Sequence, residues 1–182
     1  AAPFAPALHA KFAAAKIDIA IQPAEARRKL LLVADMDSTI IQQECIDELA
    51  AELGLKDKIS EITARAMRGE IEFEPALRER VGLLKGLPLA ALESVYQNRI
   101  TEMPGGRALV ATMKKHGATC ALVSGGFTFF TERVAAAVGF DLNRANTLLF
   151  VDGKLSGEVG TPILGRQAKI DALVELRDAR NL

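Results

Sequence analysis

Two acids follow the most apolar stretch of the sequence. The run "LLVADMDSTI", from Leu31 to Ile40, begins like a buried strand and then presents Asp35 and Asp37. Side chains two residues apart in an extended segment point to the same side, so both carboxylates can face one reacting centre. Neighbouring carboxylates tend to separate their pKa values, which provides a nucleophile or base together with a general acid. The same oxygens suit Mg²⁺, which binds one or two carboxylates together with phosphate.

A second polar group follows a later apolar stretch. The segment "ATCALV" (118–123) is typical of a buried strand, and Ser124, Gly125 and Gly126 come directly after it. The hydroxyl and two glycines, which let backbone N–H groups approach closely, suit an oxyanion, although Ser-Gly-Gly also forms ordinary tight turns. Lys169 lies on the last predicted helix, where a single lysine is usually solvated.

The elements around these residues alternate in type. Apolar residues at helical spacing predict four helices between about Glu44 and Ile100. A helix, the strand over 118–123, a helix, a β-hairpin around Asp152-Gly153 and a last amphipathic helix follow. Near the start, "IDIAI" (17–21) alternates like a half-buried strand.

This succession predicts an α/β fold, a Rossmann-like parallel sheet with helices on both faces and an inserted helical block. We expect residues 29–43 and 101–182 to form the α/β core and residues 44–100 to form the helical block. Residues 1–28 would be an N-terminal segment, compatible with the remnant of a regulatory domain. Because ligands of such sheets bind outside the carboxyl ends of the strands, the two polar groups should meet in one crevice.

The composition gives no sign of a nucleic-acid or membrane partner. Lys and Arg together number 23, as do Asp and Glu, so no overall field favours nucleic acid or an anionic membrane. No apolar run approaches the length of a membrane span. Cys45 and Cys120, far apart in apolar surroundings, indicate reduced thiols and a cytoplasmic location. Homodimer formation is left open.

The motifs together resemble a known family. "DMDST", then "SGG" after a later strand, then Lys169 near a helix start resemble the first three motifs of the haloacid dehalogenase-like phosphatases. The segments "DMDSTIIQQECIDELA" and "AMRGEIEFEPALRERVGLLKGLP" closely resemble members that hydrolyse O-phosphoserine, and the resemblance covers Lys29 to Leu182. It implies an Mg²⁺-dependent phosphomonoester hydrolase of serine biosynthesis that works through an aspartyl-phosphate.

The resemblance also implies roles for individual residues. Asp35 would be the nucleophile and Asp37 the general acid and base, and both would contribute oxygens to Mg²⁺. The phosphoryl oxygens would be held by Ser124, Gly125 and Lys169.

The resemblance makes the helical block 44–100 a cap, which would bind the two charged ends of a zwitterionic substrate. Glu44 would hold its amine and Arg80 its carboxylate, for which a guanidinium offers a two-pronged partner. Met67 and Phe73 would shield the site from water.

One feature of the family is not found in the sequence. The resemblance implies a fourth motif, a pair of acids after a further strand that supplies the remaining Mg²⁺ ligand, but the sequence stops at Leu182. We therefore expect this 182-residue piece to be truncated at its C-terminus, to bind Mg²⁺ poorly and to turn over slowly, whereas the intact protein is active. The alternatives are a related phosphatase of another small phosphomonoester, a catalytically inactive ligand-binding module and, last, a nucleotide-binding protein that uses "SGGF".

Overall fold

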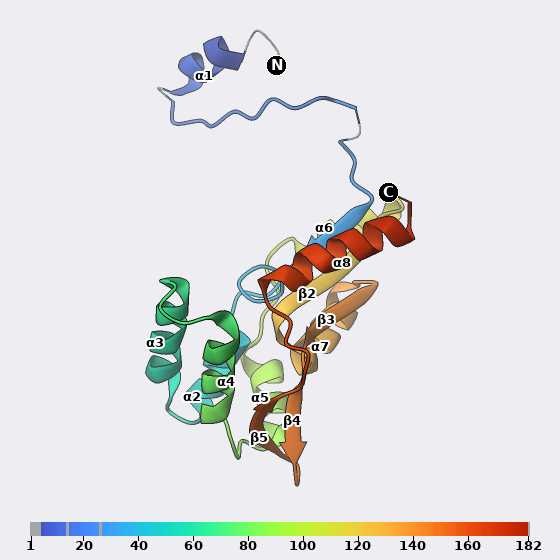
Figure 1. Ribbon diagram of the computed structural model, residues 1–182. Helices are drawn as coiled ribbons and strands as arrows, with labels where there is room; N and C mark the ends of the chain where they lie inside the picture. Colours follow the sequence, from blue (N-terminus) through green and yellow to red (C-terminus); the bar gives the residue numbers. More distant parts are fainter. Residues whose placement is uncertain (1–4, 14, 26, 182) are drawn as a thin grey trace.

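The computed structural model describes residues 5–13, 15–25 and 27–181. The remaining positions of the predicted N-terminal segment (1–4, 14 and 26) and the last residue of the predicted core (182) lie outside the described residues. Both helices and strands are present, with the helices α2 to α6 in succession between β1 and β2 (Figure 1). In chain order they are α1 (Ala5–Ala13), β1 (Leu31–Ala34), α2 (Cys45–Glu52), α3 (Lys56–Met67), α4 (Phe73–Leu83), α5 (Leu89–Arg99), α6 (Gly106–Lys115), β2 (Thr119–Phe127), α7 (Thr128–Val138), β3 (Leu142–Asn146), β4 (Leu148–Val151), β5 (Lys154–Val159) and α8 (Arg166–Ala179).

A three-stranded parallel sheet forms the centre of the fold. Its order is β1-β2-β3, with Leu31 opposite Thr119 and Ala121 opposite Leu142. All three strands run the same way, so their carboxyl ends meet at one edge. The parallel sheet expected from the sequence is confirmed.

Helices cover both faces of this sheet, as expected. Residues of β2 alternate between two apolar clusters, because successive side chains of a strand point to opposite faces. Ala121 and Val123 pack with Ala172 and Leu176 of α8. On the other face, Leu122 joins the large cluster that contains residues of α6 and α7. Figure 1 shows α8 lying across β1 and β2.

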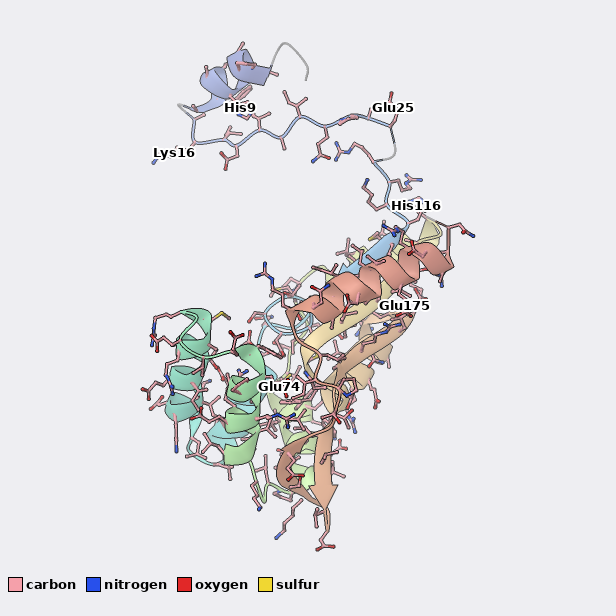
Figure 2. All side chains as sticks on the ribbon, viewed as in Figure 1. His9, Lys16, Glu25, Glu74, His116 and Glu175 are labelled. Carbon is pink, nitrogen blue, oxygen red and sulfur yellow. The ribbon has the colours of Figure 1, made fainter. Side chains whose placement is uncertain are left out.

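An ion pair joins α8 to β3. Arg144 donates two hydrogen bonds to Glu175, at 2.7 and 2.5 Å, and Figure 2 shows Glu175 on α8. Both side chains are well exposed, so the pair contributes little to the free energy of unfolding. Its geometry nevertheless marks where the helix lies against the sheet.

The helices α2 to α5 leave the sheet and return to it at one place. The outgoing and returning segments are joined by hydrogen bonds from Met103 N–H to the Ile40 carbonyl (2.8 Å) and from Gln42 N–H to the Thr101 carbonyl (3.0 Å). The hairpin β4–β5 contacts the same helices, since Gly86 N–H donates to the carbonyl of Leu155 at 2.8 Å. In Figure 1 this helical group lies beyond the carboxyl ends of β1 and β2.

Two sequence expectations differ from the structure. The segment 17–21 is not a strand, and Ile17 and Ile21 are 53% and 45% exposed, because no strand lies alongside to pair with it among the described residues. Conversely, β3 was not expected, because "LNRAN" lacks a β-type apolar pattern. It is a strand because its backbone pairs with β2.

The predicted helices are found near their expected ends. Gly117 and Gly139 follow α6 and α7, and both have positive φ, as glycine at a helix C-terminus commonly does. Cys45 and Cys120 are free and buried, as expected. Within the described part of the chain, the helices are all too short or too polar to cross a membrane.

Candidate active site

One cavity of about 380 Å³ gathers the chemically interesting residues. It lies between the carboxyl ends of β1 and β2, the start of α8, and the helices α2 to α4. All nine residues that the sequence nominates line it, namely Asp35, Asp37, Glu44, Met67, Phe73, Arg80, Ser124, Gly125 and Lys169. The structure therefore brings together residues that are up to 134 positions apart in the chain.

Asp35 is the first residue after β1, and both of its oxygens are engaged. Its Oδ1 accepts a hydrogen bond from the N–H of Met36 at 2.9 Å, and its Oδ2 accepts one from Nζ of Lys169. Each of the paired side chains is 38% exposed. The carboxylate is thus fixed in direction, with a cation beside it, while its outer side stays open to the cavity.

Asp37 lies in the turns between β1 and α2. Its Oδ1 accepts a hydrogen bond from the N–H of Cys45 at 3.3 Å. Burial raises its pKa to about 6, and the nearby carboxylates of Glu44 and Asp35 add to this effect, while the hydrogen bonds from Cys45 oppose it. A carboxyl with a pKa near 6 can both give and take a proton close to neutral pH.

Ser124 and Gly126 bring β2 up against Asp37. Oγ of Ser124, a residue only 3% exposed, accepts the N–H of Gly126 at 2.9 Å. A Cβ at position 126 would lie 2.8 Å from Oδ2 of Asp37 and 3.1 Å from Oγ of Ser124. The close approach of strand and acid therefore requires glycine at this position.

Glu44 lies at the start of α2, across the cavity from the sheet. Its Oε1 accepts a hydrogen bond from Oγ of Ser38 at 2.6 Å. Ser38 itself has a positive φ of 50°, which an L-residue rarely adopts. The carboxylate is held at the cavity wall as a fixed negative charge.

Arg80 supplies a positive charge from α4. Its Nε donates to the Ala76 carbonyl at 3.2 Å, and its Nη1 donates to Oγ1 of Thr63 at 3.1 Å. Burial lowers its pKa, and the carboxylates of Asp47 and Glu44 oppose the decrease. Opposite charges thus face one cavity from α2 and α4, which suits a zwitterionic ligand.

Phe73 and Met67 differ in their contact with the sheet. The ring of Phe73, at the start of α4, packs against the backbone of β2 and of the residue before α8: a Cβ would lie 3.1 Å from it at Gly125 and 3.2 Å from it at Gly165. Met67, at the end of α3, is 85% exposed. Phe73 closes the contact between helices and sheet, whereas Met67 lies at the rim.

Sequence reasoning missed several residues of this cavity. Thr63 accepts a hydrogen bond from Arg80, yet it is 17 residues away and carries no motif. Arg166, at the first position of α8, adds another cation to the wall, and Gly165 lies just before it. Nothing in the local sequence distinguishes these positions from surface residues.

The sequence model of the haloacid dehalogenase-like hydrolase family matches residues 32–182, which is most of the chain. A phosphoserine phosphatase from Archaeoglobus fulgidus is 44% identical over 162 residues, which cover 88% of this chain and 47% of that protein. The chain belongs to the haloacid dehalogenase-like hydrolase family. It spans about half the length of the curated relatives that it matches most strongly.

Solved structures of the haloacid dehalogenase-like family share the fold. The crystal structure of a hydrolase of this family from Salmonella enterica has a TM-score of 0.86 at 33% identity, covering 100% of this chain and 62% of that one. A substrate-bound complex of phosphoserine phosphatase has a TM-score of 0.79 at 36% identity, covering 86% of this chain and 74% of that one.

Asp35 and Asp37 of this haloacid dehalogenase-like hydrolase offer oxygen atoms, the kind of ligand that Mg²⁺ prefers. Asp35 provides a carboxylate oxygen and Asp37 a backbone carbonyl oxygen beside the Ser124 hydroxyl and the Gly125 N–H, and Mg²⁺ usually takes one or two carboxylates together with other oxygen ligands. Among the described residues, no group of three or more His, Cys, Asp or Glu side chains could enclose a metal by itself. The donors at the end of β1 therefore fit Mg²⁺ in kind, with further ligands needed to complete its coordination.

Proposed function

We propose that the protein hydrolyses O-phosphoserine to serine and inorganic phosphate. The observation that carries the proposal is the cavity itself. It contains the oriented carboxylate of Asp35 and the carboxyl of Asp37, whose pKa is about 6. The Ser124 hydroxyl and the Gly125 N–H can donate to phosphate oxygens, and Glu44 and Arg80 add two opposite charges. A phosphorylated amino acid presents a matching phosphate, amine and carboxylate.

In the proposed reaction, Asp35 attacks phosphorus in line and forms an aspartyl-phosphate as the ester bond breaks. Asp37 gives its proton to the departing serine oxygen and later takes a proton from the water that hydrolyses the intermediate. The Asp35 carboxylate and the Asp37 backbone carbonyl would hold Mg²⁺, which would neutralise charge on the phosphoryl group. A 36% identical relative whose structure is a phospho-aspartyl intermediate analogue of phosphoserine phosphatase supports this assignment.

The phosphoryl oxygens would be held by Oγ of Ser124, the N–H of Gly125 and Nζ of Lys169. Lys169 already donates to Asp35, so it would hold the nucleophile and the phosphoryl group together. Arg80 would pair with the substrate carboxylate and Glu44 with its amine. Helices α2 to α5 would act as a cap, with Phe73 and Met67 excluding water.

The nucleophile is tested by trapping. The complete gene product and the 182-residue chain are each incubated with O-phosphoserine and Mg²⁺, phosphate release is measured, and the intermediate is reduced with borohydride and mapped. A label on Asp35 is the expected result. A label elsewhere refutes the mechanism, and phosphate release in neither preparation favours a ligand-binding module.

The substrate is tested at Arg80. Arg80→Met should raise KM for O-phosphoserine at least tenfold while changing KM for phenyl phosphate less than threefold. Arg78→Met is the matched control, because Arg78 lies on the same helix but pairs with Glu74 at the exposed surface. Equal effects of Arg80→Met on both esters would instead identify a phosphatase of another small phosphomonoester.

We also propose a cytoplasmic location, in keeping with the two free, buried cysteines.

A further inference from the structure

Asn146, the last residue of β3, is a buried amide outside the cavity lining. It is 1% exposed, and its side chain makes three hydrogen bonds to the backbone. Its Nδ2 donates to the carbonyls of Gly125 (2.8 Å) and Leu164 (3.1 Å), and its Oδ1 accepts the N–H of Leu164 (2.7 Å). Both donors and the acceptor of the amide are therefore used.

The bond to Gly125 replaces a missing part of the sheet. The pairing of β2 with β3 is regular as far as Val123, opposite Arg144, and then shifts register before Phe127 meets Asn146. The shifted interval contains Ser124, Gly125 and Gly126, the proposed phosphate-binding segment. The Asn146 side chain satisfies the Gly125 carbonyl in this interval and so fixes the plane of the Gly125–Gly126 peptide. The N–H of Gly125 is attached to the same Cα, and its direction is constrained through that atom.

The bonds to Leu164 act on the other side of the cavity. Leu164 lies two residues before α8, the helix that carries Lys169. The amide of Asn146 engages both the N–H and the carbonyl of Leu164, as a neighbouring strand would. The Phe73 ring packs against the residues next to this junction, Gly125 and Gly165.

We propose that Asn146 is a positioning residue, which sets the distance between the Gly125 N–H on β2 and Lys169 on α8 by joining Gly125 to the segment that leads into α8. This inference rests on the proposed function, in which both groups hold the phosphoryl oxygens. Asn146 does not line the cavity and acts only through those groups. Because donors that meet the transition state must be placed within a fraction of an ångström, the clamp should affect kcat more than KM.

The test compares two asparagines of β3. Asn146→Asp keeps the shape and the acceptor but replaces the donating amide nitrogen with oxygen. Asn143→Ala is the control, because Oδ1 of Asn143 accepts a hydrogen bond from Oγ1 of the buried Thr131 on α7, away from the cavity. Asn146→Ser, which retains one donor and one acceptor, replaces the aspartate variant if the latter does not fold.

Two measurements are made on each variant. Asn146→Asp should lower kcat for O-phosphoserine at least 30-fold with KM changed less than threefold. Amide hydrogen exchange should accelerate in both segments, 123–127 and 163–169. Asn143→Ala should lower the thermal midpoint without either effect.

A clear failure is equally defined. The proposal is overturned if exchange accelerates in only one of the two segments, or if Asn143→Ala lowers kcat as much as Asn146→Asp. If the parent protein does not hydrolyse O-phosphoserine, the proposed function fails, whereas the exchange measurement still decides whether Asn146 couples the segments 123–127 and 163–169.

Discussion

Asp37 should make the ligand-free protein less stable as the pH rises. Its pKa is 3.8 in an unfolded chain and about 6 in the folded protein, chiefly because burial penalises the carboxylate. Since the folded pKa is raised, the folded state binds the proton more tightly, and this stabilisation is complete below pH 4 and lost as the pH passes 6. At about 1.4 kcal/mol per pKa unit, the loss amounts to about 3 kcal/mol.

Asp37→Asn isolates the free-energy cost of burying the Asp37 charge. Asparagine is neutral at every pH and keeps an Oδ1 acceptor for the N–H of Cys45. We expect the variant to be more stable than the parent by up to about 3 kcal/mol at pH 8, with the difference disappearing by pH 4. For a domain of this size the gain at pH 8 corresponds to a rise in Tm of about 6–12 °C.

The assay is thermal and urea unfolding between pH 4 and pH 8, in EDTA and without phosphate. The control is Asp152→Asn at the exposed tip of the β4–β5 hairpin, where φ is 51°, a conformation that asparagine also adopts. Any gain at that position should not vary with pH. A gain from Asp37→Asn that is absent at pH 8, or as large at pH 4 as at pH 8, would refute the argument that burial of the charge causes the cost.

Two further predictions concern the same site. Lys169→Gln should change the free energy of unfolding by less than about 1 kcal/mol, because the ion pair of Lys169 with Asp35 is partly exposed. The same variant should bind inorganic phosphate at least tenfold more weakly, as measured by calorimetry. A large loss of stability with unchanged phosphate affinity would contradict this prediction. Gly126→Ala should cost about 1–3 kcal/mol and at least 100-fold in kcat, because its Cβ would collide with Asp37. Gly82→Ala, in α4 with no neighbour nearer than 4.0 Å, should instead raise the thermal midpoint, and equal midpoints for the two alanine variants would show that the collision is relieved.

Sequence patterns predicted the elements whose structure is decided locally. The helices α3 to α5 follow from apolar spacing, and Pro88 marks where α5 begins. Patterns failed where a partner decides. "LNRAN" becomes a strand because β2 offers a backbone to pair with, and "IDIAI" has the strand pattern but no pairing partner among the described residues.

The same division holds for the site. Asp35, Ser124 and Lys169 could be nominated from motifs, because their chemistry is visible in the residue types and in the resemblance to the family. Thr63 and Asn146 could not, because their contribution lies in hydrogen bonds to groups 17 to 21 positions away. Such supporting residues have no local signature and emerge only once the backbone is arranged in space.

The helices α2 to α5 leave the sheet and return to it at neighbouring points, which bears on how the fold can be redesigned. The chain departs near Ile40 and comes back near Met103, and these two residues share a backbone hydrogen bond. The order of the strands in the sheet therefore does not depend on how many residues lie between Ile40 and Met103. A different group of helices joined at this junction would therefore leave the strand order unchanged, provided that it restored the apolar surface that α2 to α5 share with β2 and the hairpin. Such a replacement is a route to altering ligand choice.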